Sequence, residues 1–371
     1  MKRMALSIAL MLLAGPTQAD PPPSWTFQAT PAPEWSAQFE QNDGWIGGDG
    51  VYPVQLSANR IAWFFGDTWI GKIQNGKRVD CTMVNNTMVI RHGRGLDAPA
   101  DFIVRRDDDK KAVAFVAPKD GRGWFWPFAS AMVNDQLIMF LAQIEKTNDT
   151  GVFAFRQVAL WMGIVANPND PPLKWRIEQI PVPFCSFSGE RNTTFGMATC
   201  AADGFLYIFG TDENITGNNR SRHMIVARVG LDKATDANAW RFFADGKWVE
   251  DYRHCSHLAG DAASEGSVSY LPALKQYAFV YTHLGLSDQI MMRTAPNPWG
   301  PWSSATKVFT CPEMAADKNL FTYAAKGQPA ISGADELLIS YAVNSFDFWQ
   351  VARDARLYWP KFVRVKFSTP P

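Results

Sequence analysis

A short apolar segment that ends in an aromatic residue recurs five times along the chain, at intervals of roughly 60 to 75 residues. Each copy follows a turn of polar, small or glycine residues, and another short run of small or apolar residues precedes that turn. Long amphipathic helical patterns are absent. The five copies occupy residues 63–65, 138–140, 207–209, 279–281 and 339–341. A unit that opens each time with a hairpin predicts an all-β fold built from repeats.

Further strands complete most of these units. Third strands are predicted at 83–91, 159–166, 223–229 and 289–294, and fourth strands at 112–117, 175–181, 240–248 and 306–309. Five units of four antiparallel strands are typical of a five-bladed β-propeller. The fifth unit has one clear segment after its hairpin, at 360–367, so we expect residues 25–30 to supply its outer strand. Such closure removes an exposed sheet edge.

The first 19 residues have the pattern of a processing signal. Lys2 and Arg3 precede an apolar run at 4–14, and small residues at 17–19 offer a cleavage site. The run is too short for a membrane span, and no later run approaches about 18 apolar residues. The sequence therefore predicts an exported, secreted or periplasmic protein, with residues 20–371 forming one propeller domain that we expect to be a monomer.

The amino-acid composition restricts the classes of molecule that we expect the protein to bind. The formal net charge is +0, from 36 Lys+Arg against 36 Asp+Glu, which argues against nucleic acid or an anionic membrane surface. The 25 Phe, 15 Trp and 9 Tyr suit a β-rich core, and any exposed Trp would suit stacking on sugars. Five cysteines leave the pairing open, with room for one or two disulfides. The scattered histidines show no metal-ligand spacing, so we expect no metal or cofactor.

Two acidic residues occupy the same place in the repeat. Asp49 lies 16 residues before Phe65, and Glu265 lies 16 residues before Tyr281. Because the inner strands of a propeller line its central channel, both carboxylates could face one opening. Glycoside hydrolysis needs two carboxyl groups about 5 Å apart for retention, or roughly 6.5–9.5 Å apart for inversion. The alternative for Asp49 is a turn role between two glycines. The Glu265 carboxylate, if it lies inside a strand, must face water or have a partner, because burial of a lone carboxylate is costly.

Other polar positions have two interpretations each. Asp67 could tune a neighbouring carboxyl group or hold its loop through local hydrogen bonds. Asn85 and Asn86 interrupt an apolar strand, so they either fasten the blade or bind sugar hydroxyls. Arg191 could reach the channel mouth or belong to a surface loop. The repetition of arginine at positions 91, 228 and 293 favours framework salt bridges.

Motifs along nearly the whole mature chain resemble a family of secreted bacterial domains long labelled only as of unknown function. The matching segments are 47–52, 63–68, 85–87, 209–211, 226–228, 264–268, 295–302, 338–345 and 358–362. That family is placed among five-bladed propellers similar to glycoside hydrolases, and some members are endo-D-arabinanases that cut mycobacterial arabinan. The resemblance implies a glycan-directed role with Asp49 and Glu265 as the carboxylates. One departure is Gln328, at the expected start of the fifth inner strand, where a histidine is expected before Pro329.

The sequence therefore predicts a glycoside hydrolase that acts on a polysaccharide or oligosaccharide, with arabinan as one candidate. Asp49 is the expected base and Glu265 the expected acid, by analogy with other five-bladed glycosidases, and Asp67 a modulator. The residues expected to contact substrate are Tyr52, Asn85, Asn86, Trp126, Arg191, Gln328 and Asn344. A non-catalytic glycan-binding propeller and an envelope scaffold are the competing hypotheses, because propellers host many functions. No Ser-x-Asp-x-Gly-x-x-Trp box occurs, which counts against a typical sialidase.

Overall fold

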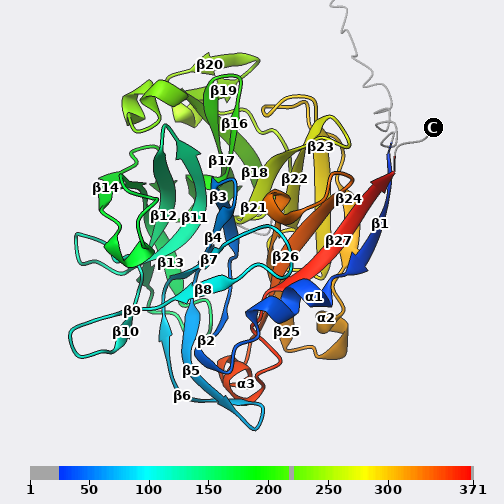
Figure 1. Cartoon of the computed structure of the whole chain (residues 1–371). Helices are drawn as coiled ribbons and strands as arrows, with labels where there is room; N and C mark the ends of the chain where they lie inside the picture. The colour runs from blue at the N-terminus through cyan, green and yellow to red at the C-terminus, as the bar shows by residue number, and fades with distance from the viewer. Residues whose placement is uncertain (1–24, 217–220, 369–371) are drawn as a thin grey trace, which may run out of the picture.

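The computed structural model describes residues 25–216 and 221–368. Regular structure in these ranges is mostly β-strand, as predicted, and it forms five antiparallel sheets of four or more strands together with two smaller sheets (Figure 1). The predicted signal segment at 1–19 lies outside the described residues.

Each of the five larger sheets contains an antiparallel run of at least four strands. The first sheet has β3 (Tyr52–Ser57), β4 (Arg60–Phe65), β7 (Thr87–Arg91) and β8 (Ala100–Ile103). The second has β11 (Trp124–Val133), β12 (Gln136–Lys146), β13 (Phe155–Val165) and β14 (Ile177–Pro181). The third has β15 (Ser186–Phe187), β16 (Arg191–Ala202), β17 (Phe205–Asn214), β18 (Ser221–Gly230), β19 (Arg241–Ala244) and β20 (Lys247–Val249). The fourth has β21 (Gly266–Leu271), β22 (Gln276–Thr282), β23 (Gln289–Ala295) and β24 (Thr306–Thr310). The fifth has β25 (Leu320–Gly327), β26 (Glu336–Ser345), β27 (Lys361–Ser368) and β1 (Thr26–Pro31).

Successive sheets lie side by side through neighbouring strands. β3 contacts β11, β11 contacts β16, β16 contacts β21, and β21 contacts β25. Gln328, directly after β25, closes the succession back to the first sheet. Its Oε1 accepts from Trp63 Nε1 at 2.9 Å, and its Nε2 donates to the carbonyl of Val51 at 3.1 Å. The first and last sheets are therefore joined by a buried amide.

The first and last strands of the described residues pair as the sequence predicts. β1 pairs antiparallel with β27 along its whole length, from Thr26 opposite Ser368 to Pro31 opposite Val363. The N-terminal strand thus lies on the outer side of the fifth sheet, beside the last strand (Figure 1). The pairing covers what would otherwise be an exposed edge of β27.

The strand that carries the repeated apolar segment is buried in every sheet. β4, β12, β17, β22 and β26 each pair on both sides, and most of their residues are buried. A strand covered on both faces needs apolar residues at consecutive positions instead of alternating ones. This explains why the repeat is visible in the sequence. The buried apolar side chains form clusters between neighbouring sheets.

The first sheet differs from the prediction because a hairpin is inserted into it. β5 (Thr68–Gln74) and β6 (Lys77–Val84) pair with β2 (Asp43–Gly48) in a separate three-stranded sheet. The third strand is therefore Thr87–Arg91 only, and the fourth is β8 instead of 112–117. β10 (Ala112–Val113) pairs with β9 (Arg105–Arg106) in a small sheet of its own. The prediction of a strand at 240–248 is also corrected, because a turn divides it into β19 and β20.

Helices are short and lie between strands. They are α1 (Pro33–Ser36), α2 (Glu313–Ala316) and α3 (Phe348–Arg353), with 3₁₀ turns at Ala37–Phe39, Pro172–Lys174, Leu231–Lys233, Ala237–Ala239, Tyr252–His254 and Pro329–Ile331. None of the helices in the described ranges is long and apolar enough to cross a membrane. All five cysteines are unpaired thiols.

The repeated arginines serve the framework, but not through salt bridges. Arg91 is fully buried and lies over the Trp35 ring at 5.1 Å. The Arg228 guanidinium lies 4.2 Å from the ring centres of both Phe205 and Trp248. No ion pair involves these arginines or Arg293 within the described residues. Aromatic rings and backbone carbonyls take the place of the predicted acidic partners.

Candidate active site

Asp49 lies in the tight loop between β2 and β3, where two chain segments are bonded together. The Asp49 N–H donates to the carbonyl of Asp67 at 3.4 Å, and the Gly66 N–H donates to the carbonyl of Asp49 at 3.0 Å. A Cβ at Gly66 would lie 2.5 Å from Asp49 Oδ1, so only glycine fits beside the carboxylate. Gly50 has a φ of +91°, which a residue without a side chain adopts at low cost. The turn expected from the sequence is present, and it fixes the position of the carboxylate.

The Asp49 carboxylate is surrounded by neutral donors. Tyr323 OH donates to its Oδ2 at 2.5 Å, and Tyr358 OH donates to the same atom at 2.9 Å. Burial raises the pKa of Asp49 to about 7, with the negative charges of Asp67 and Glu265 adding to the effect, although the two tyrosines oppose it. Within the described residues no hydrogen bond reaches Oδ1. Oδ1 is therefore the atom that can carry a proton.

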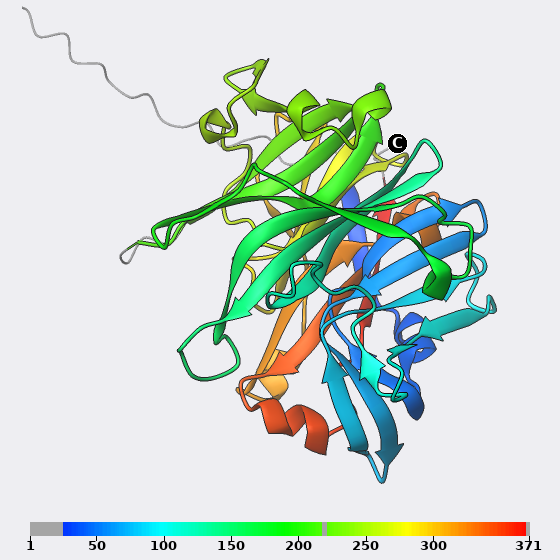
Figure 2. The same ribbon diagram turned by 90° about the vertical axis from the view of Figure 1, so that its left-hand side faces the viewer.

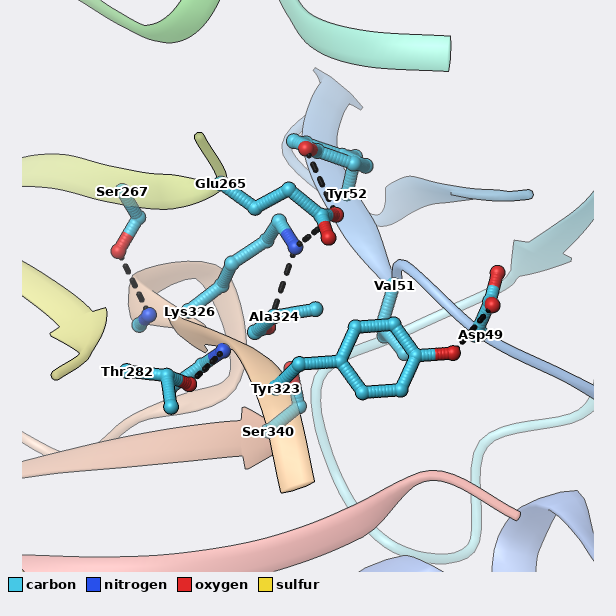
Figure 3. Close-up of polar contacts among 12 residues, drawn as sticks. Asp49, Val51, Tyr52, Glu265, Ser267, Thr282, Tyr323, Ala324, Lys326 and Ser340 are labelled. Atoms are coloured by element: carbon cyan, nitrogen blue, oxygen red, sulfur yellow. Dashed lines mark hydrogen bonds and ion pairs between the residues drawn. The ribbon is translucent and has the colours of Figure 1, made fainter. Parts of the chain in front are cut away.

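Glu265, immediately before β21, has a cationic partner instead. Its Oε1 accepts from Tyr52 OH at 2.9 Å and from Lys326 Nζ at 3.0 Å (Figure 3). Lys326 is completely buried, while 24 % of the Glu265 side chain is exposed. The ammonium also donates to the carbonyl of Ala324 at 3.1 Å and lies 3.9 Å from the centre of the Tyr52 ring. Burial lowers the pKa of Lys326, and the negative charge of Glu265 opposes that effect.

β25 connects the two carboxylates. Tyr323 reaches Asp49 and Lys326 reaches Glu265, although residues three apart on a regular strand point to opposite faces. The pairing of β25 with β26 shifts register between Tyr323 and Lys326, and Ala324 has a φ of +59°. This bulge turns both side chains toward the same site, as Figure 3 shows. A left-handed φ at a residue other than glycine is strained, and such strain is common where a side chain must be aimed.

Asp67 forms the third member of the cluster. Its Oδ1 accepts from Trp126 Nε1 at 2.9 Å and from Asn85 Nδ2 at 3.2 Å. Burial raises the pKa of Asp67 to about 6, with both hydrogen bonds opposing the shift. Its charge is in turn the second-largest cause of the raised pKa of Asp49. Asp67 is therefore placed to act on Asp49 electrostatically, and Asn85 and Trp126 hold it.

The structure separates the remaining sequence-predicted residues into two groups. Tyr52 and Asn344 belong to the site, since Tyr52 donates to Glu265 and Asn344 Nδ2 donates to the Tyr323 hydroxyl oxygen at 3.4 Å. Asn86 does not, because it is 1 % exposed and its amide is bonded to the backbone of Val116 and Phe125.

Gln328 and Arg191 also lie outside the cluster. Gln328 is fully buried, and its amide is used by Trp63, Val51 and Ser340. It follows the end of β25, so the sequence placed the fifth inner strand too late. Arg191 forms a bidentate pair with Asp212, with both distances 2.7 Å. Neither residue contacts the three carboxylates of the cluster.

Three site residues were not predicted from the sequence. Tyr358 lies in a segment that carries the family resemblance, but nothing in that segment alone points to Asp49. Tyr323 and Lys326 lie in a run that reads as an ordinary strand. A lysine among small and apolar residues was the available signal, since a buried ammonium needs a partner. No cluster of three or more His, Cys, Asp or Glu side chains suited to a metal occurs in the described part of the chain.

The fold and the site together define a mostly β protein with three partly accessible carboxylates where its first, second, fourth and fifth sheets meet. The family described as "Domain of unknown function (DUF5005)" matches residues 33–367, and the chain belongs to that family. The predicted membership in a domain family of unknown function is thus confirmed. No curated protein matches the sequence.

Solved structures resemble the chain in fold. A candidate hydrolase from Bacteroides ovatus ATCC 8483 aligns with a TM-score of 0.74 and 20 % sequence identity, over 91 % of this chain and 90 % of that one. A thermostable family-43 glycoside hydrolase aligns with a TM-score of 0.47 and 13 % identity, over 88 % and 95 %. A GH43_1 enzyme from Xanthomonas citri complexed with xylotriose gives 0.45 and 12 %, over 90 % and 92 %. The first of these shows a shared fold.

Proposed function

We propose that the chain is an exported glycoside hydrolase that cuts a polysaccharide at the carboxylate cluster, and that its five large sheets are the blades of a five-bladed propeller. One observation carries the proposal. Asp49 and Glu265 each accept a hydrogen bond from a side chain of β25, and the charge of Glu265 contributes to the raised pKa of Asp49, yet their surroundings differ in charge. Hydrolysis of a glycosidic bond needs this combination of a carboxylic acid and a carboxylate.

The surroundings support a definite division of roles. A general acid must hold its proton near neutral pH, and the pKa of Asp49 is raised to about 7. Glu265 faces the Lys326 ammonium at 3.0 Å, which suits a group that acts as base or nucleophile in its charged form. We therefore propose Asp49 as the acid and Glu265 as its charged counterpart, the reverse of the sequence-based expectation. Asp67 keeps the pKa of Asp49 high.

Arabinan is the first polymer to test, because the sequence resemblance implies it. Export rests on the pattern of Lys2, Arg3 and the apolar run after them, which lies outside the described residues. N-terminal sequencing of the secreted protein should begin at Asp20. Intact Met1 on protein recovered from the cytoplasm would contradict export.

The decisive experiment compares sugar release by the wild type, Asp49→Asn and Glu265→Gln on mycobacterial arabinan, plant arabinan, xylan and galactan. We expect each variant to lose about 10²–10⁴-fold in kcat, the usual contribution of a positioned acid or base. Asp101→Asn is the matched control, because Asp101 is an exposed aspartate on β8, outside the carboxylate cluster, that pairs with His92. Wild-type rates in either active-site variant would remove that residue from the mechanism. Binding of a polymer without any release would favour the non-catalytic glycan-binding hypothesis.

A further inference from the structure

Two large aromatic side chains are exposed beside each other at one end of the fifth sheet. Phe346, just after β26, is 53 % exposed, and Phe153, in the turn between β12 and β13, is 46 % exposed. Their ring centres lie 6.2 Å apart, and both rings pack on Phe321, at 4.7 Å and 5.7 Å. We call these three residues the aromatic platform. Leaving apolar rings in water is unfavourable, and contiguous exposed patches usually mark a binding surface.

Two series of ring contacts connect the platform to the carboxylate cluster. In the fifth sheet, Phe321 lies 5.5 Å from Tyr323, the residue that donates to Asp49. In the second sheet, Phe153 lies 6.3 Å from Phe155, and Phe155 lies 4.6 Å from Trp126, the residue that donates to Asp67. Both series start at a carboxylate of the cluster and end at the same exposed surface.

The fold explains why these rings converge. Phe321 and Tyr323 are two residues apart on β25, before its bulge, so they lie on the same face of the strand. β12 and β13 are each 11 residues long, which carries the turn between them toward the end of β26 (Figure 2). The platform is thus built from two sheets that are not consecutive in the chain, and it spans the space between them.

The position of the platform identifies its ligand. A sugar ring has a face of C–H groups and a rim of hydroxyls, so the face can pack on the electron-rich face of an aromatic ring while the rim stays hydrated. Because Phe321 lies beside Tyr323, which bonds Asp49, the ligand to consider is one long enough to extend from the exposed rings to the carboxylates. A polymer of sugar rings meets both requirements at once. A folded protein or a lipid surface has no need of the carboxylates.

We propose that Phe153 and Phe346 bind successive sugar rings of an extended glycan, which runs from the platform to the bond held between Asp49 and Glu265. The proposal rests on the proposed glycan-directed function and adds the direction in which the polymer lies. It also predicts that each sugar is recognised by packing of its ring on the face of an aromatic side chain. Apolar contact area alone should not replace an aromatic ring.

The test measures binding to an array of arabinan, xylan, galactan and glucan oligosaccharides of two to eight units. We expect Phe346→Ala and Phe153→Ala to lose about threefold to tenfold in affinity for the longer oligosaccharides, the worth of one aromatic stacking contact. Phe346→Trp should keep the affinity, and Phe346→Leu should lose it. Tyr270→Ala is the matched control, because Tyr270 is 46 % exposed but lies near the other end of β21 from Glu265.

The outcomes separate this proposal from the proposed hydrolase function. Retention of no arrayed glycan by the wild type, equal losses in Tyr270→Ala, or full affinity in Phe346→Leu would overturn the platform. So would self-association, or binding to phosphatidylglycerol vesicles, that depends on Phe346 in place of glycan binding. Binding that depends on Phe346 without sugar release would overturn hydrolysis and leave the platform standing. Sugar release with unchanged binding in all variants would overturn the platform and leave the proposed hydrolase function standing.

Discussion

Asp49 and Asp212 are two aspartates enclosed by hydrogen-bond donors, and their donors differ in charge. Asp49 accepts from the neutral hydroxyls of Tyr323 and Tyr358. Asp212 accepts from the Arg191 guanidinium, from His257 at 2.7 Å and from Thr193 at 2.8 Å. Burial raises the pKa of both carboxyl groups, but the donors to Asp212 outweigh burial and lower its pKa overall. The neutral donors to Asp49 leave its pKa raised by burial and by nearby negative charges, whereas the donors to Asp212, among them a guanidinium, lower its pKa.

The difference assigns the two residues to different tasks. Asp212 is locked as an anion that joins β16, β17 and the segment before β21, and it strengthens the fold. Asp49 is held by two hydrogen bonds but has a raised pKa, which costs stability and would supply the acid of the proposed hydrolase. Perturbed carboxyl groups at functional sites commonly show this exchange of stability for reactivity.

The largest expected contrast is in stability. Asp212→Asn should lower the free energy of unfolding at pH 8 by about 2 kcal/mol, because it breaks a bidentate ion pair. The expected loss is smaller than for a fully buried pair, because the Arg191 side chain is 56 % exposed and water screens its charge. Asp49→Asn should be neutral or stabilising at that pH, because it removes a buried charge and keeps both tyrosine bonds. Urea unfolding of the two variants measures the difference. Equal destabilisation would show that the two carboxylates have the same role.

The second contrast is in pH dependence. The pKa of Asp49 rises from 3.8 to about 7 on folding, so the folded state binds the proton more tightly and wild-type stability falls as pH rises through that interval. Asp49→Asn does not make this pH-dependent contribution to stability, because asparagine does not titrate. Its stability relative to the wild type should therefore grow between pH 5 and pH 8, by up to a few kcal/mol. Urea midpoints at pH 5, 6.5 and 8 measure the change, and a constant difference would contradict the raised pKa.

The smallest effect concerns single donors. Tyr358→Phe removes one neutral bond that favours the charged form of Asp49, so the pKa of Asp49 should rise further, by about half to one pH unit. His257→Gln should leave Asp49 unchanged, because His257 contacts Asp212. The pH dependence of sugar release by both variants measures this. A lowered value in Tyr358→Phe would contradict the role of the tyrosine.

The sequence predicted the mostly β fold, the repeat and the partner of the last strand, because each leaves a local pattern. Apolar runs mark strands buried on both faces, and the matching places of Asp49 and Glu265 follow from repeat spacing. What the structure adds is that both carboxylates accept hydrogen bonds from the same strand, β25. The expected start of the fifth inner strand at Gln328 was wrong, because β25 ends at Gly327 and a 3₁₀ turn at Pro329–Ile331 lies between β25 and β26.

Lys326 and Tyr323 could not be assigned from the sequence. Their side chains share a site only because a bulge at Ala324 changes the alternation of β25, and a bulge has no reliable sequence signature. The inserted β5–β6 hairpin likewise shifted the fourth strand of the first sheet. The charge of each carboxylate's partners is a tertiary property, so the proposed division of roles between Asp49 and Glu265 could not be derived from the sequence.

The central claim is that Asp49 holds a proton at neutral pH. A carbon-13 NMR titration of the aspartate side-chain carboxyl groups tests it directly, with Asp49→Asn identifying the resonance by its loss. We predict a midpoint at about pH 7 for Asp49. A midpoint near pH 4, the ordinary value for aspartate, would contradict the account and return the role of acid to Glu265.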